Sequence, residues 1–352
     1  MKNLNISQQN LNIFMNILGF DSLLETSYGK TSVSANSLLT GLRIRHDDKW
    51  YIVGSACSNL GRNPHRIVNA SPDEQDYKVL LLSALLLAGN NQKEKINLTL
   101  GFPFSTFNTH NSLAETFLSQ KHFSIEYDTS LYIRDGKTER KIIEIDKFDC
   151  IPELTACVIG LKKEYKILED NFLVVSLGFG TTEIGVVTEE GLNQRTTISV
   201  PGIIRCIQNF RDELEREYFI GFMTDNQLDK AFRKGNLLIN RKLINIQKIR
   251  RDILQAFYKE YISDTIRSQI SDRDFEKIEK IYICGGGANY TELMESFDIE
   301  FGKMVKIEKI AESDTLAAVG YYHNSQRIAG SSDSENVGID LGNSSTYICF
   351  NT

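Results

Sequence analysis

The chain has 352 residues with ordinary charged (24%) and apolar (41%) fractions, so it is long enough to form two globular domains with separate cores. Its 40 basic and 46 acidic residues give a formal net charge of −6, which argues against a broad electrostatic grip on nucleic acid. The most apolar run, residues 79–88, is too short for a membrane span, and the six cysteines form no CxxC pair, so neither a zinc site nor a disulfide framework is indicated.

The first residues, 1–34, carry no functional motif that we can name. Four apolar residues in this segment have the spacing of one helix face, which makes a helix one interpretation: Leu11, Phe14, Met15 and Leu18. Residues 19–22 lack a glycine turn, so we interpret them as a loop.

Apolar periodicity and turn residues then predict alternating strands and helices along the chain. In the first half we expect strands near 50–54, 96–101, 122–133 and 141–145, and helices around 75–89, 111–120 and after Pro152. The run at 79–88 should be buried between a sheet and an outer layer. In the second half we expect strands at 172–177, 183–188, 195–199 and 280–284, and helices from Pro201-Gly202 to about 217 and at 226–234, 243–269, 289–297 and 312–325.

Residues 172–187 combine a strand that looks buried, a turn rich in glycine and threonine, and an alternating strand. Turns of this kind form nests of N–H groups that hold an anion, and small residues let bare backbone approach its oxygens. Residues 281–289 contain another glycine cluster, which ends an apolar strand and opens a helix. A tight strand-to-helix turn would also account for this cluster.

Residues 240–251 form a basic stretch with two interpretations. Apolar residues could line one face of a helix while the basic residues point to solvent: Leu243, Ile244, Ile246 and Ile249. The basic residues could instead contact DNA or an acidic neighbour.

The end of the chain repeats the turn design. Residues 329–335 are polar without apolar periodicity, which is typical of a flexible linker. Residues 337–352 then form a hairpin in which Asp340 precedes a Gly342-Asn343 turn, followed by Ser344, Ser345 and Thr346. A carboxylate beside such a turn can hold a hydrated magnesium ion.

Together these segments resemble the phosphate 1, phosphate 2 and adenosine motifs of the actin-like ATPase superfamily. Residues 151–156 and 314–320 resemble its two connecting motifs. Residues 96–105 and 50–54 are similar to segments of the bacterial plasmid-segregation actins of the ParM/StbA type, with Phe102 where leucine is usual. The resemblance covers about residues 35–349.

The resemblance implies an α/β fold, an actin-like two-domain ATPase with duplicated ribonuclease H-like domains around a nucleotide cleft. Domain I would comprise residues 1–155 plus 318–352, and domain II residues 156–317. In the family the phosphate 1 hairpin opens the chain, whereas here it closes it, so we expect a circular permutation, natural or engineered. Residues 1–34 could join the permutation site instead of forming a helix.

The resemblance also assigns roles to residues. Asp340 would hold Mg²⁺ through water, unless it only caps the turn. The residues expected to clamp the phosphates are Gly342, Asn343, Ser344, Ser345, Thr346, Ser176, Gly178, Gly180, Thr181 and Thr182. The residues expected to press against the adenosine are Gly285, Gly286, Gly287 and Ala288.

Two acidic positions decide the catalytic interpretation. Glu153 is the candidate for positioning the attacking water, although an acid in a helix first turn after Pro152 is also favoured by the helix dipole. Many family members carry aspartate where this chain has Ser176, so magnesium would depend mainly on Asp340 and the hydrolysis rate is open. Glu183 occupies a position where an acid often ends the motif, unless it is simply solvated.

We therefore expect a cytoplasmic, filament-forming ATPase that uses ATP or GTP with Mg²⁺ and serves plasmid or DNA partition. Its partners would be copies of itself and a DNA-binding adaptor, with no direct contact to nucleic acid and none to a membrane. Two alternatives stay open, a nucleotide-binding scaffold with little hydrolysis and a small-molecule kinase of the same superfamily.

Overall fold

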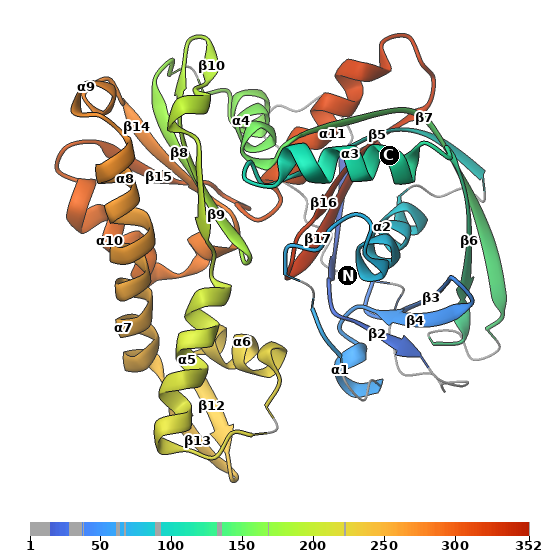
Figure 1. The fold of residues 1–352 in the computed structure, drawn as a ribbon, viewed down its shortest axis with the longest axis horizontal. Coiled ribbons are helices and arrows are strands. Elements are labelled where there is room, and N and C mark those ends of the chain that lie inside the picture. The colour runs from blue at the N-terminus through green and yellow to red at the C-terminus, as the bar shows by residue number, and fades with distance from the viewer. Residues whose placement is uncertain are drawn as a thin grey trace. The chain divides into compact units, whose positions relative to one another are not determined.

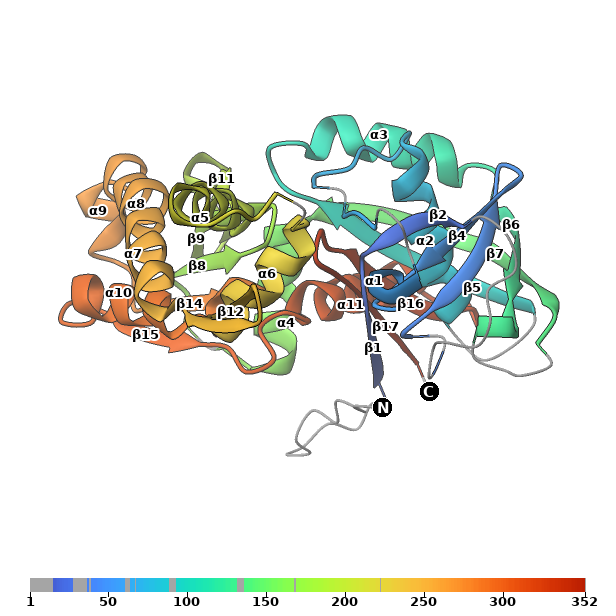
Figure 2. The same ribbon diagram turned by 90° about the horizontal axis from the view of Figure 1, so that it is seen from below.

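The computed structural model describes residues 15–27, 37, 39–60, 64–66, 68–88, 93–131, 136–167, 169–221 and 223–351. The chain forms two compact units, which Figures 1 and 2 draw as ribbons. Unit 1 comprises Met1–Tyr165 and Thr315–Thr352, and unit 2 comprises Lys166–Asp314.

Within the described residues, unit 1 contains a nine-stranded sheet in the order β1-β17-β16-β5-β7-β6-β3-β4-β2. The strands are β1 (Met15–Asp21), β2 (Leu24–Ser27), β3 (Leu42–His46), β4 (Lys49–Val53), β5 (Lys93–Phe102), β6 (His122–Asp128), β7 (Thr138–Pro152), β16 (Glu335–Leu341) and β17 (Ser345–Asn351). β16 and β7 run parallel to β5, whereas β17 is antiparallel to both β16 and β1. Strands from the two ends of the described chain therefore lie side by side, dark blue and dark red in Figure 1.

Helices cover both faces of this sheet (Figure 2). They are α1 (Cys57–Leu60), α2 (Gln75–Leu87), α3 (Phe107–Leu118), α4 (Glu153–Glu164) and α11 (Leu316–Ala329), with a 3-10 turn η1 (Thr129–Leu131). Ile348 and Phe350 of β17 pack in the core that contains α2, whereas Cys349 packs with α11 on the other face. Residues 79–88 are all buried, which confirms the predicted buried helix.

Helices α4 and α11 approach each other closely. A side chain at Gly160 would overlap Leu316, and one at Gly320 would overlap the backbone of Ala156. Because α4 packs on α11, it stays in unit 1, and the first boundary falls after Tyr165 rather than after residue 155.

Unit 2 contains a six-stranded sheet within the described part of the chain, in the order β10-β9-β8-β14-β15, with β11 also paired to β9. The strands are β8 (Phe172–Leu177), β9 (Thr181–Thr188), β10 (Gly191–Leu192), β11 (Ile198–Pro201), β14 (Lys280–Cys284) and β15 (Lys306–Lys309), and a separate hairpin comprises β12 (Asn236–Ile239) and β13 (Lys242–Asn245). The helices are η2 (Gln194–Thr196), α5 (Ile204–Glu217), α6 (Asp225–Lys234), α7 (Gln247–Phe257), the π-helix η3 (Tyr258–Ser263), α8 (Asp264–Gln269), α9 (Asp272–Phe275), η4 (Gly286–Asn289) and α10 (Thr291–Phe301). The strands β8 and β14 are parallel neighbours, and apart from Lys280 their residues are buried, as expected for parallel strands covered on both faces.

The predicted helix at 243–269 is wrong at its start, where the β12–β13 hairpin lies instead. Asn240 and Arg241 have φ of 49° and 65°, the left-handed conformation that a two-residue hairpin turn requires. Leu243 and Ile244 therefore lie in a strand, and the proposed apolar helix face does not form. The predicted helix at 312–325 likewise begins later, at Leu316, because Glu312 has a φ of 51°.

The interpretation of residues 19–22 as a loop is wrong for its first three residues, which end strand β1. Of the four residues with helical spacing, Met15 and Leu18 lie in this strand, while Leu11 and Phe14 lie outside the described residues. Pairing with β17 along all seven residues of β1 decides the conformation.

The interpretation of residues 329–335 as a flexible linker is also wrong. The Lys147 ammonium donates to the carbonyls of Ile328 (3.0 Å) and Ala329 (2.7 Å) at the end of α11. The hydroxyls of Ser332 and Ser334 donate to the Asp146 carboxylate at 2.7 and 3.1 Å. These hydrogen bonds therefore anchor the segment, which connects α11 to β16, to the middle of β7.

Candidate functional site

The turn of the β16–β17 hairpin spans residues 342–345, since Leu341 pairs with Thr346 across it. A side chain at Gly342 would overlap the carbonyl group of Ser345, so the backbone must be bare at this point. Bare backbone allows N–H groups to approach an anion closely. The turn and the first residues of β17 contain the predicted site residues Gly342, Asn343, Ser344, Ser345 and Thr346.

Asp340 and Glu153 lie at the same edge of the unit 1 sheet. Strands β16, β5 and β7 run parallel, with Ile339 level with Leu100 and Leu100 level with Cys150. Asp340 follows Ile339, and Glu153 begins α4 directly after β7. One strand separates β16 from β7, so their backbones lie about 10 Å apart. The strand that contains Asp340 and the N-terminus of α4 thus lie at the same edge of the sheet, with one strand between them.

Two residues that the sequence analysis missed hold this turn. Ser22, 1% exposed, donates its hydroxyl to the Gly342 carbonyl at 2.6 Å and its N–H to the Ser344 carbonyl at 3.1 Å. The Asn69 N–H donates to Oδ1 of Asn343 at 2.6 Å. The turn is therefore fixed from outside its own hairpin, by residues far away in the sequence.

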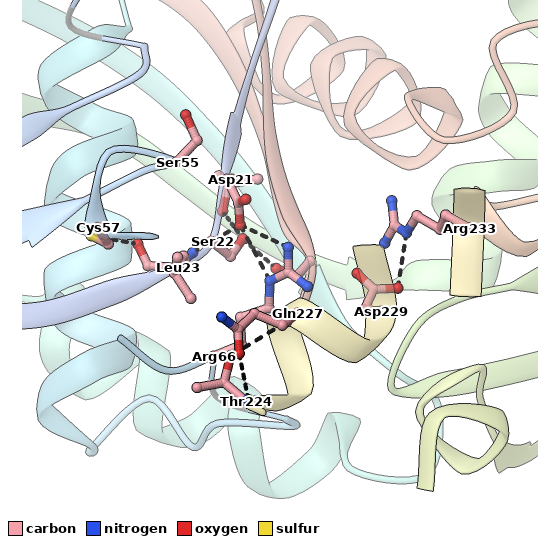
Figure 3. Close-up of polar contacts among 12 residues, drawn as sticks. Asp21, Ser22, Leu23, Ser55, Cys57, Arg66, Thr224, Gln227, Asp229 and Arg233 are labelled. Atoms are coloured by element: carbon pink, nitrogen blue, oxygen red, sulfur yellow. Dashed lines mark hydrogen bonds and ion pairs between the residues drawn. The ribbon is translucent and has the colours of Figure 1, made fainter. Parts of the chain in front are cut away.

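The end of β1 beside Ser22 is itself fixed by an ion pair, which Figure 3 shows. Oδ1 of Asp21 accepts from the Arg66 guanidinium through Nε (3.2 Å) and Nη2 (2.9 Å), and from the N–H of Leu23 (3.2 Å). The side chains of Asp21 and Arg66 are 17% and 10% exposed. This pair holds the last residue of β1 in the place from which Ser22 reaches the turn.

Unit 2 contains a turn of the same design between β8 and β9. Leu177 pairs with Thr182, so the turn spans residues 178–181, and a side chain at Gly178 would overlap the carbonyl of Thr181. The N–H groups of three consecutive residues donate to this turn: Gly202 to Gly180 at 3.0 Å, Ile203 to Gly178 at 3.1 Å and Ile204 to Phe179 at 2.8 Å. The predicted residues Gly178, Gly180, Thr181 and Thr182 thus form a second turn with bare backbone at its first residue.

Ser176 and Glu183 face each other across the β8–β9 pair. Residues directly opposite in an antiparallel pair point to the same face of the sheet, so the carboxylate of Glu183 lies beside the serine. Glu183 is 1% exposed and accepts a hydrogen bond from the Ser199 hydroxyl at 2.8 Å. The interpretation of Glu183 as a solvated residue is therefore wrong, because the sheet buries it next to the turn.

The glycine cluster at 285–288 lies against the β8–β9 hairpin. Gly285 has a φ of +81° and exchanges hydrogen bonds with Ser313, at 2.8 Å through its N–H and 3.0 Å through its carbonyl. A side chain at Gly285 or at Gly287 would overlap Leu177, the last residue of β8. The predicted residues Gly285, Gly286, Gly287 and Ala288 are thus brought together with Ser176 and the turn in one unit.

Helix α6 of unit 2 has polar contacts of its own, also drawn in Figure 3. Thr224 and Gln227 form a capping box at its start, and the helix ends at Gly235 with a φ of 72°. The nearly buried carboxylate of Asp229 accepts from Arg233 at 2.9 Å. These contacts fix the ends and one side of the helix.

The surroundings of four cysteines disfavour the thiolate form. Burial raises the pKa of each of the following thiols, which disfavours the nucleophilic thiolate: Cys57, Cys150, Cys206 and Cys349. In the part of the chain that the structure describes, no three or more His, Cys, Asp or Glu side chains gather as a metal site. None of the helices in that part has the length and apolar character needed to cross a membrane.

Comparison with known proteins bears on the fold. Residues 19–153 match the sequence family described as "Actin like proteins N terminal domain". A search among curated protein sequences gave no match.

Several solved structures are similar over most of the chain. An archaeal actin homologue has a TM-score of 0.71 at 17% identity, covering 88% of this chain and 92% of that one, and its complex with ADP has a TM-score of 0.68. A non-polymerisable quadruple mutant of pCBH ParM has a TM-score of 0.72 at 17% identity, covering 90% and 97%. A ParM in a 15-stranded filament from Clostridium botulinum has a TM-score of 0.71 at 16% identity, covering 88% and 92%. The expected actin-like α/β fold is confirmed.

Proposed function

We propose that this chain, which has the actin-like fold, binds and hydrolyses ATP or GTP and assembles with copies of itself into filaments. The observation that carries the proposal is the pair of matching turns, at residues 342–345 and 178–181, each with a glycine that admits no side chain. Two relatives support it, an archaeal actin homologue solved with ADP and a ParM solved as a filament.

Each turn has a role in this proposal. The N–H groups of residues 342–346 and 178–182 bind the phosphates, while residues 285–288, packed against Leu177, accommodate the nucleoside. Glycine at the first position of each turn is what allows the phosphate oxygens to approach the backbone.

Asp340 suits a magnesium ion. Mg²⁺ in nucleotide sites is usually held by one or two carboxylates together with phosphate oxygens and water, and Asp340 offers one carboxylate at the sheet edge beside the turn. A bound ion would neutralise charge on the phosphates. In unit 2 the carboxylate of Glu183, directly opposite Ser176, would supply a second negative charge for the ion.

Glu153 would orient the attacking water. It is the first residue of α4 at the same sheet edge as Asp340, and positioning of water is a large part of phosphoryl-transfer catalysis.

Ser176 favours a second candidate function, a nucleotide-binding scaffold with slow hydrolysis, because serine supplies no negative charge. Single-turnover hydrolysis of Mg-ATP by wild type and Glu153→Gln separates the two: equal slow rates would favour the scaffold.

We also propose that the chain is circularly permuted. In unit 2 the three adjacent strands follow in chain order, β8, β9 and β11, whereas the matching strands of unit 1 are β16, β17 and β1. The registers agree, since Thr181 pairs with Pro201 as Ser345 pairs with Asp21. A chain with residues 335–351 moved ahead of residue 1 should keep its thermal unfolding midpoint and ligand affinity. A chain that fails to fold would contradict this proposal.

Exposed apolar residues support self-assembly. Leu238 and Leu243 face each other across the β12–β13 hairpin and are 64% and 70% exposed. Ile299 and Met304, near the end of α10, are 79% and 62% exposed. The neighbouring pair Leu238 and Leu243 therefore offers exposed apolar surface to a protein–protein contact.

In the cell we propose a cytoplasmic role in segregating plasmid DNA through a DNA-binding adaptor.

Sedimentation with light scattering tests the filament proposal. Wild-type protein should form pelletable polymer in Mg-ATP and less in Mg-ADP or without nucleotide, because nucleotide states matter only when they differ in affinity for the assembled conformation. Protein that stays monomeric at high concentration in all three conditions would contradict assembly. The rearranged chain with residues 335–351 in front is the control for an effect of strand order on assembly.

A further inference from the structure

The two turns are held by different chemistry. In unit 2 the N–H of Ile203 donates to the Gly178 carbonyl at 3.1 Å. In unit 1 the matching carbonyl, that of Gly342, instead accepts from a side chain, the hydroxyl of Ser22, at 2.6 Å. A bond that the main chain makes in one unit therefore depends on a single hydroxyl in the other, and that hydroxyl can be removed by mutation.

Ser22 makes two further hydrogen bonds around the turn. Its N–H donates to the Ser344 carbonyl at 3.1 Å, and its hydroxyl oxygen lies 3.0 Å from Oγ1 of Thr346. A hydroxyl has one hydrogen, and that of Ser22 is used on the Gly342 carbonyl, which can only accept. Thr346 must therefore donate to Ser22. The hydrogen of the Thr346 hydroxyl is committed to the protein and not to a ligand.

These bonds determine which way the N–H groups of the turn point. In a planar trans peptide the carbonyl and the following N–H point in opposite directions. Holding the carbonyls of Gly342 and Ser344 toward Ser22 therefore directs the N–H groups of Asn343 and Ser345 away from it. The orientation of two potential anion donors thus depends on Ser22.

We propose that Ser22 is a positioning residue that orients the backbone N–H groups of the β16–β17 turn toward a nucleotide phosphate (Figure 3 shows its place at the end of β1). The inference rests on the proposed function, in which this turn binds phosphate. Ser22 does not touch the ligand itself; it acts through the carbonyls of Gly342 and Ser344.

Serine 22 can be compared with a matched serine. Ser83 is 0% exposed and donates its hydroxyl to the Val79 carbonyl at 2.7 Å inside α2 of the same unit. Ser22→Ala and Ser83→Ala each delete one buried hydroxyl bonded to a main-chain carbonyl, but only the first affects the turn, where it also removes the acceptor of the Thr346 hydroxyl. Ser22→Cys keeps a weak donor and should give an intermediate result.

The experiment has two arms, both well below the unfolding temperature. In the first, without nucleotide, amide hydrogen exchange is measured across residues 341–347. Ser22→Ala should speed this exchange several-fold, whereas Ser83→Ala should not. In the second, Kd is measured for Mg-ADP and for adenosine. Ser22→Ala should weaken Mg-ADP binding roughly five- to tenfold, the loss expected if the misoriented turn makes one hydrogen bond fewer to the phosphate, and leave adenosine binding unchanged.

Each contrary result has a definite meaning. Unchanged exchange, or unchanged Mg-ADP affinity, in Ser22→Ala would overturn the positioning role. Equal weakening of Mg-ADP and adenosine would also overturn it, because it would show that Ser22 acts through general stability. Wild-type protein that binds neither ligand would overturn the proposed function, and the exchange arm would still decide whether Ser22 fixes the turn.

Discussion

In the β16–β17 hairpin Asp340 faces Tyr347, while in the β8–β9 hairpin the residues at the same two positions are Ser176 and Glu183. Both hairpins have a four-residue turn that begins with a glycine, and both have a third strand beside the second. The acid thus lies on the first strand in unit 1 and on the second strand in unit 2. The same backbone turn therefore occurs with the acid on either strand of the hairpin.

The hydroxyls at the two matching threonines differ as well. Thr346 of unit 1 is bonded to Ser22, whereas Oγ1 of Thr182 is buried and has no hydrogen-bond partner among the described residues. A buried hydroxyl without a partner costs free energy unless something else satisfies it. We infer that the Thr182 hydroxyl of unit 2 can bond a ligand, whereas the Thr346 hydroxyl of unit 1 is already bonded to Ser22.

The largest effect should come from filling the bare backbone of either turn. Gly342→Val and Gly178→Val should each abolish nucleotide-dependent polymer in a pelleting assay, because the new side chain would overlap the carbonyl of Ser345 or of Thr181. Gly191→Val is the control, since Gly191 has a φ of +108° and open space around it, so the substitution strains the backbone away from both turns. Polymer in only one of the two turn variants would mean that the turns are not functionally equivalent.

The next largest effect should be on Mg-ATP binding, when Asp340 or Glu183 is neutralised. Asp340→Asn should weaken Mg-ATP binding roughly 10- to 100-fold and leave binding in EDTA nearly unchanged, since one charge-assisted interaction with the ion is lost. Glu183→Gln should weaken Mg-ATP binding less. Titration with and without Mg²⁺ measures both variants. A larger effect at Glu183 than at Asp340 would reverse the assignment of the principal acid.

Substitution of the two matching threonines, Thr346 and Thr182, should have opposite effects on fold stability and nucleotide affinity. Thr346→Val deletes the bond to Ser22 and should lower the free energy of unfolding by about 1 kcal/mol. Thr182→Val deletes a hydroxyl without a partner, so stability should stay the same or rise, while nucleotide affinity should fall a few-fold. Denaturant unfolding and ligand titration measure the two quantities. Loss of stability in Thr182→Val would show that its hydroxyl has a structural partner.

The smallest effect is on the pH dependence of stability. In unit 2 the Lys280 ammonium beside Glu169 lowers the pKa of that carboxyl to about 2, and in unit 1 the hydroxyl of Ser332, with Lys95, lowers the pKa of Asp146. A lowered pKa means that each carboxylate stabilises the fold above its ordinary pKa and that this stability is lost as pH falls. Glu169→Gln should therefore lower the unfolding midpoint at neutral pH, with the difference from wild type vanishing between about pH 4.5 and 2. A difference that persists at pH 2 would contradict the assignment, and Asp146→Asn provides the unit 1 comparison.

The local parts of this architecture could be predicted from the sequence. Glycine and threonine after an apolar strand identify both turns, because a tight turn limits residue choice at the turn itself. The glycine cluster at 285–288 follows the same logic. The buried helix α2 was predictable from ten consecutive residues without a charge.

The parts that depend on distant partners could not be predicted. Ser22 and Asn69 act on a turn that lies 320 and 274 residues away in the chain, and nothing in their own neighbourhood marks them. The β12–β13 hairpin turns at Asn240-Arg241 without glycine, and Leu243 and Ile244 of this hairpin have helical spacing with Ile246 and Ile249, which follow it. The segment 329–335 has the composition of a flexible linker, and its hydrogen-bond partner Asp146 lies in a strand far away in the sequence, so the sequence pattern does not reveal the contact.

Whether both turns bind one nucleotide is tested by a calorimetric titration of wild type, Gly342→Val and Gly178→Val with Mg-ATP. If both turns bind the same nucleotide, wild type takes up one nucleotide per chain and each variant takes up none, while both variants keep a cooperative unfolding transition. Two nucleotides per wild-type chain, or undiminished binding by either variant, would contradict the account.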